Sequence, residues 1–307
     1  MVQSYGVYLA YYLTSQRYPS ATPLQFAFIG GLSVSQSMLI APFATSLARR
    51  TSTRKTMALG IVLEVGSLIA ASFSTEIWHL FLTQGIIFGW SVGLLFTTSM
   101  STISQWFDRK RGVANGISAA GTGIGGLIFS LSIQAAITRL GVQWSFRIVA
   151  VCVGVVHTVC TLLIKDRNKS IRPNQRAFDH RLFRHGGFVL VASWSCLSML
   201  GFIVILFSLP AYAASVGMSA QQGSILSAVL NLGVAFGRPL VGLGSDHFGR
   251  INVSGVLTLV SGLSCFVIWM WARAFGVALI FSLLNGAVCG VFWTVRAQTR
   301  VDSNAVR

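Results

Sequence analysis

Apolar residues in this chain gather into long runs that are separated by short polar segments. A hydrocarbon core of about 30 Å is crossed by about 20 helical residues, because each residue adds about 1.5 Å. The runs therefore predict nine complete membrane-spanning helices, near residues 24–48, 57–73, 78–100, 113–136, 144–164, 187–213, 222–243, 251–271 and 275–295. Residues 1–14 are also apolar and aromatic, but about 14 residues reach only about 21 Å, so they are expected to form part of a first helix.

Composition supports a membrane protein rather than a soluble one. Hydrophobic residues make up 53% of the 307 residues, charged residues make up only 10%, and the mean hydropathy is +0.70. The net charge of +16 does not indicate nucleic-acid binding, because the basic residues form short clusters between the apolar runs. The five cysteines lie inside apolar runs without a CxxC pair, so no disulfide framework, metal site or cofactor is expected.

Basic residues also predict which side of the membrane each segment faces. Eighteen of the 23 lysines and arginines fall on one side of the predicted layout, three fall on the other, and two lie within spans. Because cytosolic loops carry the excess of positive charge, the eighteen mark the cytosolic side. The longest hydrophilic segment, 165–186, is then a cytosolic linker between an N-terminal six-helix half (1–164, first helix incomplete) and a C-terminal half (187–307, helices 7–10).

A weak internal repeat supports this division. Residues 42–53 (PFATSLARRTST) and 239–250 (PLVGLGSDHFGR), 197 positions apart, each place a proline late in an apolar helix, followed by a short polar loop and another helix. The same offset places 78–100 on 275–297, which fits the last predicted span. It also predicts that helix 1 starts before Met1 and that two helices follow Arg307. The chain is therefore expected to be truncated at both ends, without helices 11 and 12 of a six-plus-six transporter.

Several stretches carry a family resemblance. The segment GLGSDHFGR at 242–250 resembles the loop motif G-x-x-x-D-x-x-G-R of the major facilitator superfamily. Four further stretches are similar to the monocarboxylate porter family, and in particular to its fungal branch: GVYLAYY (6–12), QWFDRKRGVANGISAAGTGIGG (105–126), WSFRI (144–148) and FDHRLF (178–183). The similarity runs over nearly the whole chain, and the block at 105–126 is its most specific part.

The resemblance implies an all-α membrane protein of the major facilitator type, with two six-helix halves around a central cavity and about ten spans in this chain. It implies a secondary transporter that moves a small organic anion, a monocarboxylate first of all, by alternating access. Two alternatives stay open: a porter or exporter of a vitamin or fungal secondary metabolite, and a non-transporting remnant or nutrient sensor. An enzyme is not expected, since the sequence has no catalytic constellation. The plasma membrane is the expected location, with a vacuolar or other internal membrane as the alternative.

Arg238 is the candidate substrate-binding residue. A charge at the centre of a span costs roughly 2.5–3.5 kcal/mol, so such a residue usually faces a partner, a cavity or a substrate. In the monocarboxylate porters an arginine before a proline on helix 8 is implicated in holding the substrate carboxylate, and Arg238 before Pro239 resembles that pattern. The alternative is an arginine whose side chain extends to the cytosolic headgroups, only about 9 Å away.

Two further polar residues are candidates within the spans. Asn231 lies seven residues before Arg238, on the same helix face, and is the second candidate for substrate contact. Animal porters carry a proton-coupling aspartate one turn before the arginine, where this sequence has Val234. Glu64 is the only acid well inside a predicted span, so it is the candidate site for a coupled proton. The alternative is a Glu64 that reaches solvent or pairs with a basic loop, and His157 is expected to be a packed core histidine.

Conformational change is expected to involve two polar segments and a set of glycines. The helix that carries Arg238 is expected to break at Pro239 and to be followed by a loop with Asp246, Gly249 and Arg250. A second, hinge-like segment contains Asp108, Arg109 and Arg111. Two glycine pairs have the GxxxG spacing of close helix packing: Gly121 with Gly125, and Gly233 with Gly237. These interfaces either slide during transport or are static contacts.

Overall fold

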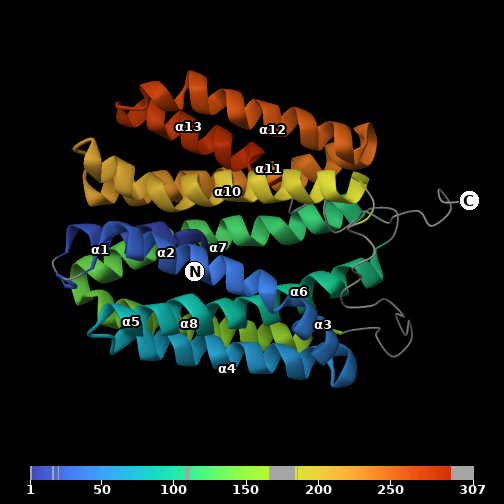
Figure 1. Cartoon of the computed structure of the whole chain (residues 1–307), viewed down its shortest axis with the longest axis horizontal. Coiled ribbons are helices and arrows are strands. Elements are labelled where there is room, and N and C mark those ends of the chain that lie inside the picture. The colour runs from blue at the N-terminus through green and yellow to red at the C-terminus, as the bar shows by residue number, and fades with distance from the viewer. Residues whose placement is uncertain are drawn as a thin grey trace, which may run out of the picture.

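The computed structural model describes residues 2–15, 17–19, 21–107, 111–165, 184 and 186–291, and its regular elements in these ranges are all helical. The long helices lie side by side along one common direction and form a bundle (Figure 1). The predicted all-α architecture is therefore confirmed for this part of the chain. The predicted linker at 165–186 lies almost entirely outside the described residues.

Following the predicted division, we call the described residues 2–165 the N-terminal half and the described residues 186–291 the C-terminal half. The N-terminal half begins with a short 3-10 turn and contains most of the helices. Its elements are η1 (Val2–Ser4), α1 (Tyr5–Thr14), α2 (Pro23–Leu39), α3 (Ala41–Arg50), α4 (Thr53–Ser72), α5 (Ile77–Leu80), the π-helical segment η2 (Phe81–Ile87), α6 (Phe88–Trp106), α7 (Arg111–Leu140) and α8 (Val142–Leu163). Local sequence sets the helix starts: Thr22 and Gln25 form a capping box before α2, and the Ser52 hydroxyl caps α4 by accepting from the Lys55 amide.

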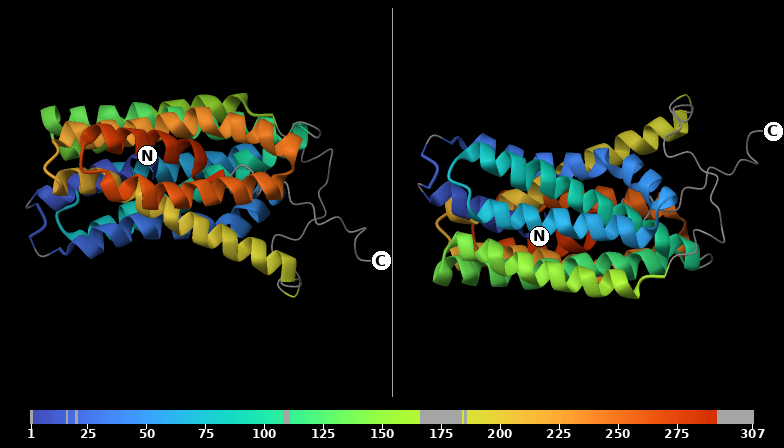
Figure 2. Two further views of the ribbon diagram at one scale, coloured as in Figure 1. Left: turned by 90° about the horizontal axis from the view of Figure 1, so that it is seen from above. Right: turned by 90° about the horizontal axis from the view of Figure 1, so that it is seen from below.

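The C-terminal half (residues 186–291) consists of α10 (Gly186–Ser215), α11 (Ala220–Phe248), α12 (Arg250–Val267), the 3-10 turn η4 (Trp269–Trp271) and α13 (Phe275–Val288). Ser219 and Gln222 form the capping box that starts α11. The first turns of α10 stand away from the rest of the bundle (Figure 2). The α11–α12 turn consists of Gly249 alone, whose φ of 87° lies in the region that favours glycine.

The described residues contain seven helices that are long and apolar enough to cross a membrane. An eighth results if α2 and α3 form one broken span, because they meet at an angle of 41° where Pro42 enters the first turn of α3. The last predicted span corresponds to α13, which has only 14 residues in this structure. The chain is a multi-pass integral membrane protein, but the prediction of nine complete spans is not confirmed.

The structure corrects the prediction that the helix breaks at Pro239. Helix α11 runs without interruption from Ala220 to Phe248, with Pro239 inside it. Proline removes one backbone donor, and such a loss is tolerated in membrane helices where neighbouring helices pack closely and re-satisfy the backbone. The expected loop at 242–250 is therefore mostly helical, and Asp246 lies on the last turns of α11.

The two halves meet where α11 lies along α7, and this is the most extensive contact between any two of the described helices. The buried face of α7 carries small residues spaced four and three apart: Gly112, Gly116, Ala119, Gly123, Gly126 and Ser130. A Cβ atom at Gly116 would lie 2.6 Å from the Arg238 carbonyl oxygen, and one at Gly123 would lie 2.5 Å from the Ala235 nitrogen. The backbones of α7 and α11 therefore touch, and we call this contact the α7–α11 interface.

The glycine pairs do not both lie where their spacing predicted. A Cβ atom at Gly121 or Gly125 would meet no described atom within 4 Å, because these residues lie on a different face of α7 from the interface glycines. The prediction that they form a helix interface is therefore wrong for the described residues. Gly233 and Gly237 do lie at a close contact, but their partner is α13, so this contact lies within the C-terminal half.

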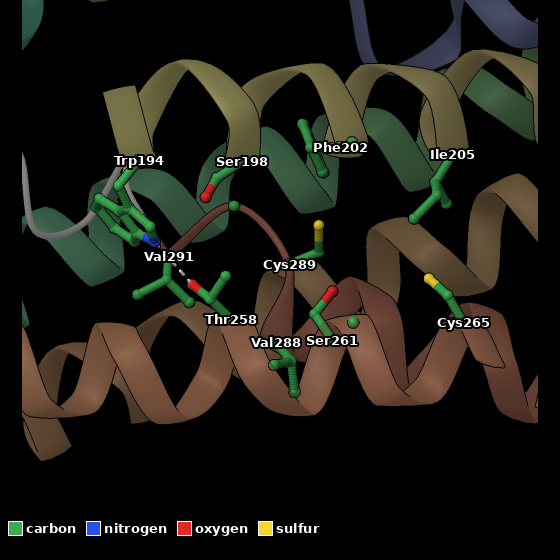
Figure 3. A pocket seen from close by; sticks show the side chains of 13 residues that line it. Trp194, Ser198, Phe202, Ile205, Thr258, Ser261, Cys265, Val288, Cys289 and Val291 are labelled. Carbon is green, nitrogen blue, oxygen red and sulfur yellow. Dashed lines mark hydrogen bonds between the residues drawn. The ribbon is translucent and has the colours of Figure 1, made fainter. Parts of the chain in front are cut away.

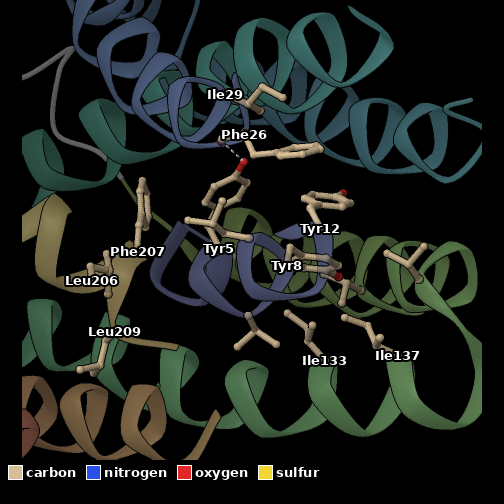
Figure 4. Packing of buried hydrophobic residues seen from close by; sticks show 14 of the residues in the cluster. Tyr5, Tyr8, Tyr12, Phe26, Ile29, Ile133, Ile137, Leu206, Phe207 and Leu209 are labelled. Carbon is tan, nitrogen blue, oxygen red and sulfur yellow. Dashed lines mark hydrogen bonds between the residues drawn. The ribbon is translucent and has the colours of Figure 1, made fainter. Parts of the chain in front are cut away.

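Helix α1 lies at the centre of the hydrophobic core and connects both halves. Figure 4 shows its tyrosines between α7, α10 and the start of α2. The Tyr5 hydroxyl donates to the Phe26 carbonyl oxygen at 2.7 Å, and its ring meets Phe207 of α10 edge to face. The ring of Tyr8 stacks on Phe146 of α8 with centroids 4.5 Å apart. The aromatic residues of α1 thus hold the elements around the α7–α11 interface in place.

Candidate functional site

Arg238 is buried at the α7–α11 interface, with only 4% of its surface exposed. One guanidinium nitrogen, Nη1, donates to the Thr122 hydroxyl oxygen at 2.9 Å and to the Ala119 carbonyl oxygen at 3.4 Å. Both acceptors belong to α7, so Arg238 forms a polar contact between the halves. It does not extend to the headgroups, which was the alternative for this residue.

The remaining guanidinium atoms of Arg238 have no partner in the described structure. Nε and Nη2 are buried and make no hydrogen bond, and no described carboxylate lies within ion-pair distance. These two atoms share one edge of the guanidinium plane, the edge that binds a carboxylate through two parallel hydrogen bonds. A buried charge without a counter-charge is costly, so this edge of the guanidinium is chemically suited to bind an anion.

Asn231 is on the same face of α11 as Arg238, as the spacing predicted. Its side-chain nitrogen donates to the Ser227 carbonyl oxygen at 2.8 Å and, more weakly, to the Gln3 carbonyl oxygen at 3.5 Å. Its side-chain oxygen is buried without a partner. Seven residues of helix separate Asn231 and Arg238 by about 10 Å along the axis, so a very small anion cannot contact both in this arrangement.

Small hydroxyl residues that the sequence did not single out complete this polar region. Thr122 is the partner of Arg238 on α7. About one helical turn after Thr122 on α7, the Gly126 carbonyl oxygen accepts hydrogen bonds from the Ser130 hydroxyl at 2.6 Å and from the Ser4 hydroxyl of η1 at 3.4 Å. Threonine and serine are common in membrane helices, where they bond to their own backbone, so the sequence alone gave no signal that these residues lie opposite Arg238 and Asn231.

Asp246 connects the halves at the end of the bundle that is predicted to be cytosolic. Its Oδ2 atom accepts from the backbone amide of Val113 at 3.2 Å, in the first turn of α7. A Cβ atom at Gly112 would overlap this carboxylate, so the contact requires glycine there. A carboxylate at a helix N-terminus accepts from free amides and interacts favourably with the helix dipole.

Among the other residues of the two predicted conformational segments, the structure describes a role only for Gly249. Gly249 forms the turn between α11 and α12. Asp108 and Arg109 lie outside the described residues, as do the side chains of Arg111 and Arg250.

Glu64 lies elsewhere, at the contact between α4 and α8. Its side chain is 5% exposed, and its Oε2 atom lies 2.8 Å from Nδ1 of His157, whose side chain is 38% exposed. The histidine was expected to be a packed core residue, and instead it pairs with the carboxylate. Helix α4 packs against α8 and α6, whereas α11 packs against α7, α13 and α10, so Glu64 is separate from the Arg238 site.

A pocket of about 190 Å³ lies between α10, α12 and the end of α13 (Figure 3). Its walls are mostly apolar, and the one polar bridge drawn across it joins the Trp194 indole nitrogen to the Thr258 hydroxyl at 3.2 Å. None of its lining residues is charged. Arg238 does not line the pocket, but the preceding residue, Gly237, packs against Ala287 next to the pocket wall. The pocket and the candidate anion site are therefore neighbours rather than one site.

Comparison with known proteins relates the chain to membrane transporters. Residues 1–303 match the family model described as Major Facilitator Superfamily. The chain is 32% identical over 299 residues to Probable transporter MCH2 and 35% identical over 300 residues to Uncharacterized transporter ESBP6, both of Saccharomyces cerevisiae. It is 29% identical over 290 residues to the Aspyridones efflux protein apdF of Emericella nidulans.

These alignments cover most of the chain but only part of each relative. They include 96%, 94% and 94% of the chain, against 63%, 45% and 58% of MCH2, ESBP6 and apdF. The chain thus spans about half to two thirds of the length of these relatives.

Proposed function

The chain belongs to the major facilitator superfamily, and from this membership and the surroundings of Arg238 we propose that it acts as a secondary transporter of small organic anions. Monocarboxylates are the proposed substrate class, because several stretches of the sequence resemble the monocarboxylate porter family. The family and the names of the relatives favour transport rather than catalysis.

The observation that carries this proposal is the unpaired edge of the Arg238 guanidinium. Nε and Nη2 are buried without a partner, in a part of the protein where no described carboxylate compensates the charge. A substrate carboxylate supplies both the missing charge and the two acceptors that this edge requires. Transport follows if the two halves separate at the α7–α11 interface and expose Arg238 to one side of the membrane at a time. Asp246 and Val113 then hold the halves together at one end while Arg238 is closed off.

The direct test is uptake of matched charged and neutral solutes. We expect proteoliposomes with the purified chain to take up pyruvate and lactate saturably, and to take up pyruvamide and lactamide at least about tenfold more slowly, because an amide presents one acceptor and no charge to Arg238. Radiolabel uptake against protein-free liposomes measures this. Equal rates for acids and amides would contradict anion selectivity.

A larger organic solute is the second candidate substrate, and one structural observation favours it. Asn231 has a free buried acceptor about 10 Å along α11 from Arg238, a separation that a three-carbon acid does not span. A solute with a carboxylate at one end and a donor at the other contacts both residues. The efflux protein named for aspyridones among the relatives is consistent with this candidate. Export of such a larger solute from preloaded vesicles, together with poor uptake of pyruvate, would favour the larger solute over a monocarboxylate as the substrate.

Glu64 and His157 are the proposed binding site for a coupled proton. Their 2.8 Å contact lets one proton be held between a carboxylate and an imidazole at membrane depth, where an unpaired carboxylate is costly. The elements packed on α4 add few other ionisable groups: Arg147, Cys152 and Cys160 on α8, Arg49 and Arg50 on α3, and none on α6 or η2. A proton at this pair acts on the α4–α8 contact and does not neutralise Arg238.

Substitution of this pair is expected to uncouple uptake from a proton gradient. In Glu64→Gln, pyruvate uptake should no longer be stimulated by an acidic outside, while uptake at equal pH persists, because glutamine keeps a polar contact but cannot exchange the proton. His157→Gln should behave alike. Glu76→Gln is the matched control, since Glu76 is an exposed acid that lies before α5, where it contacts Trp78 and His79 and not α4 or α8. Full gradient stimulation in Glu64→Gln would exclude this site.

A further inference from the structure

The atoms of Arg238 that a carboxylate needs are not accessible in this structure. Nε and Nη2 each expose almost no surface, and backbone contacts at Gly116 and Gly123 bring α7 against α11 on both sides of the arginine. An anion therefore cannot reach the binding edge while the interface is closed. Either the guanidinium turns or α7 and α11 separate before the substrate is bound.

Thr122 of α7 holds the guanidinium of Arg238 in its buried position. Its hydroxyl donates to the Ala119 carbonyl oxygen at 2.7 Å, so its hydrogen is engaged and its lone pairs point to an incoming donor. Nη1 of Arg238 occupies that acceptor at 2.9 Å. Because Thr122 belongs to the N-terminal half and Arg238 to the C-terminal half, this hydrogen bond crosses the closed interface.

We propose, on the basis of the proposed function, that Thr122 is a positioning residue that holds Arg238 in the empty transporter and releases it when an organic anion binds. A carboxylate is a stronger acceptor for a guanidinium than a neutral hydroxyl, and it also offers two oxygens to the unpaired edge. Because Nε and Nη2 are buried while Nη1 is held by Thr122, the guanidinium must leave Thr122 before it presents this edge to the substrate, so binding removes a contact between the halves. A neutral solute carries no charge that draws the guanidinium away from Thr122, and it leaves the interface closed.

Two variants isolate the hydroxyl acceptor from the shape of the side chain. Thr122→Val is nearly isosteric but cannot accept from Arg238, and Thr122→Ser keeps the acceptor. Asp246→Asn is the comparison variant, because it weakens a different contact between the halves, which a carboxylate does not touch. Circular dichroism and size exclusion establish that each variant is folded.

The measurement is the distance between two spin labels, one at Ile117 on α7 and one at Leu240 on α11, which are both exposed positions. The labelled protein carries alanine in place of its five native cysteines. Uptake by this cysteine-free background is confirmed before labelling. Without ligand, we expect Thr122→Val to raise the ratio of open to closed molecules about tenfold, because this is the usual effect of losing a hydrogen bond to a charged group. Thr122→Ser should have the same ratio as the parent. Adding pyruvate should open the parent, Thr122→Ser and Asp246→Asn, but should change Thr122→Val little further.

Equal distance distributions for Thr122→Val and the parent without ligand would overturn the role of Thr122, whatever the substrate is. A normal opening effect of Thr122→Val combined with no response of the parent to any anion would instead contradict the proposed function and leave the contact itself established. In transport assays Thr122→Val should also lower the discrimination between pyruvate and pyruvamide. A merely structural threonine would reduce both rates equally.

Discussion

Arg238→Met is expected to reduce saturable anion uptake strongly without lowering the thermal stability of the chain. Loss of one partner from a buried charge pair costs about 2–5 kcal/mol, which corresponds to about a 30- to 5,000-fold decrease in uptake efficiency. Stability should be equal or higher, because methionine replaces a buried cation that lacks a counter-charge in the described structure. Uptake of labelled pyruvate and the melting temperature, measured on the same preparation, test both parts.

Two further variants make this result specific to Arg238. Arg238→Lys keeps the positive charge but loses the two-pronged edge, so its uptake should lie between those of the parent and the methionine variant. Arg147→Met removes a charge from α8, where Arg147 contacts Ser72 and the rings of Phe73 and Trp144, and uptake should change only a few-fold. Parent-like uptake in Arg238→Met would remove Arg238 from the site and with it the main support for an organic anion.

Gly123→Ala is expected to be the most damaging of the small substitutions on α7. Its Cβ atom would lie 2.5 Å from both the Ala235 nitrogen and the Asn231 carbonyl oxygen, and backbone atoms cannot rotate away. Restoring a normal contact distance requires α7 and α11 to move apart by about 1 Å, at a cost of about 1–3 kcal/mol. The same movement lengthens the 2.9 Å bond between Thr122 and Arg238 beyond hydrogen-bond range. Melting temperature and pyruvate uptake should both fall.

Gly121→Ala provides a matched control on the same helix. Its Cβ atom meets no described atom within 4 Å, so the substitution adds no clash. Alanine favours a helix over glycine by about 1 kcal/mol, so the melting temperature should stay equal or rise. If Gly121→Ala and Gly123→Ala lowered stability equally, the close approach of α7 and α11 at Gly123 would not be the cause.

Helical periodicity predicted the parts of the site that lie on one helix. It placed Asn231 and Arg238 on one face of α11, and the structure has both on the face toward α7. Apolar runs likewise located the long helices, although predicted and observed helix ends differ by up to seven residues. These features depend on local geometry that repeats along the chain, so the order of polar and apolar residues is sufficient to predict them.

Features that depend on how helices pack against each other were not predictable in the same way. The pairing of Glu64 with His157 joins residues 93 positions apart, and Thr122 meets Arg238 across the two halves. Glycine spacing indicated close packing on α7 but selected the wrong face, because two faces of that helix carry small residues. The loop expected after Pro239 was also wrong, since tertiary packing keeps α11 helical through the proline.

The close approach of backbones at the α7–α11 interface has a consequence for the kinetics of transport. Dispersion attraction between atoms in contact falls steeply within the first ångström of separation, and no long side chains from Gly116, Gly123 or Gly126 remain to bridge a partly opened gap. When α7 and α11 are only partly separated, they have thus lost their dispersion attraction but have not yet bound a solute between them. The transition between closed and open forms should therefore be cooperative, with two populated states and a barrier between them rather than a continuous range of widths.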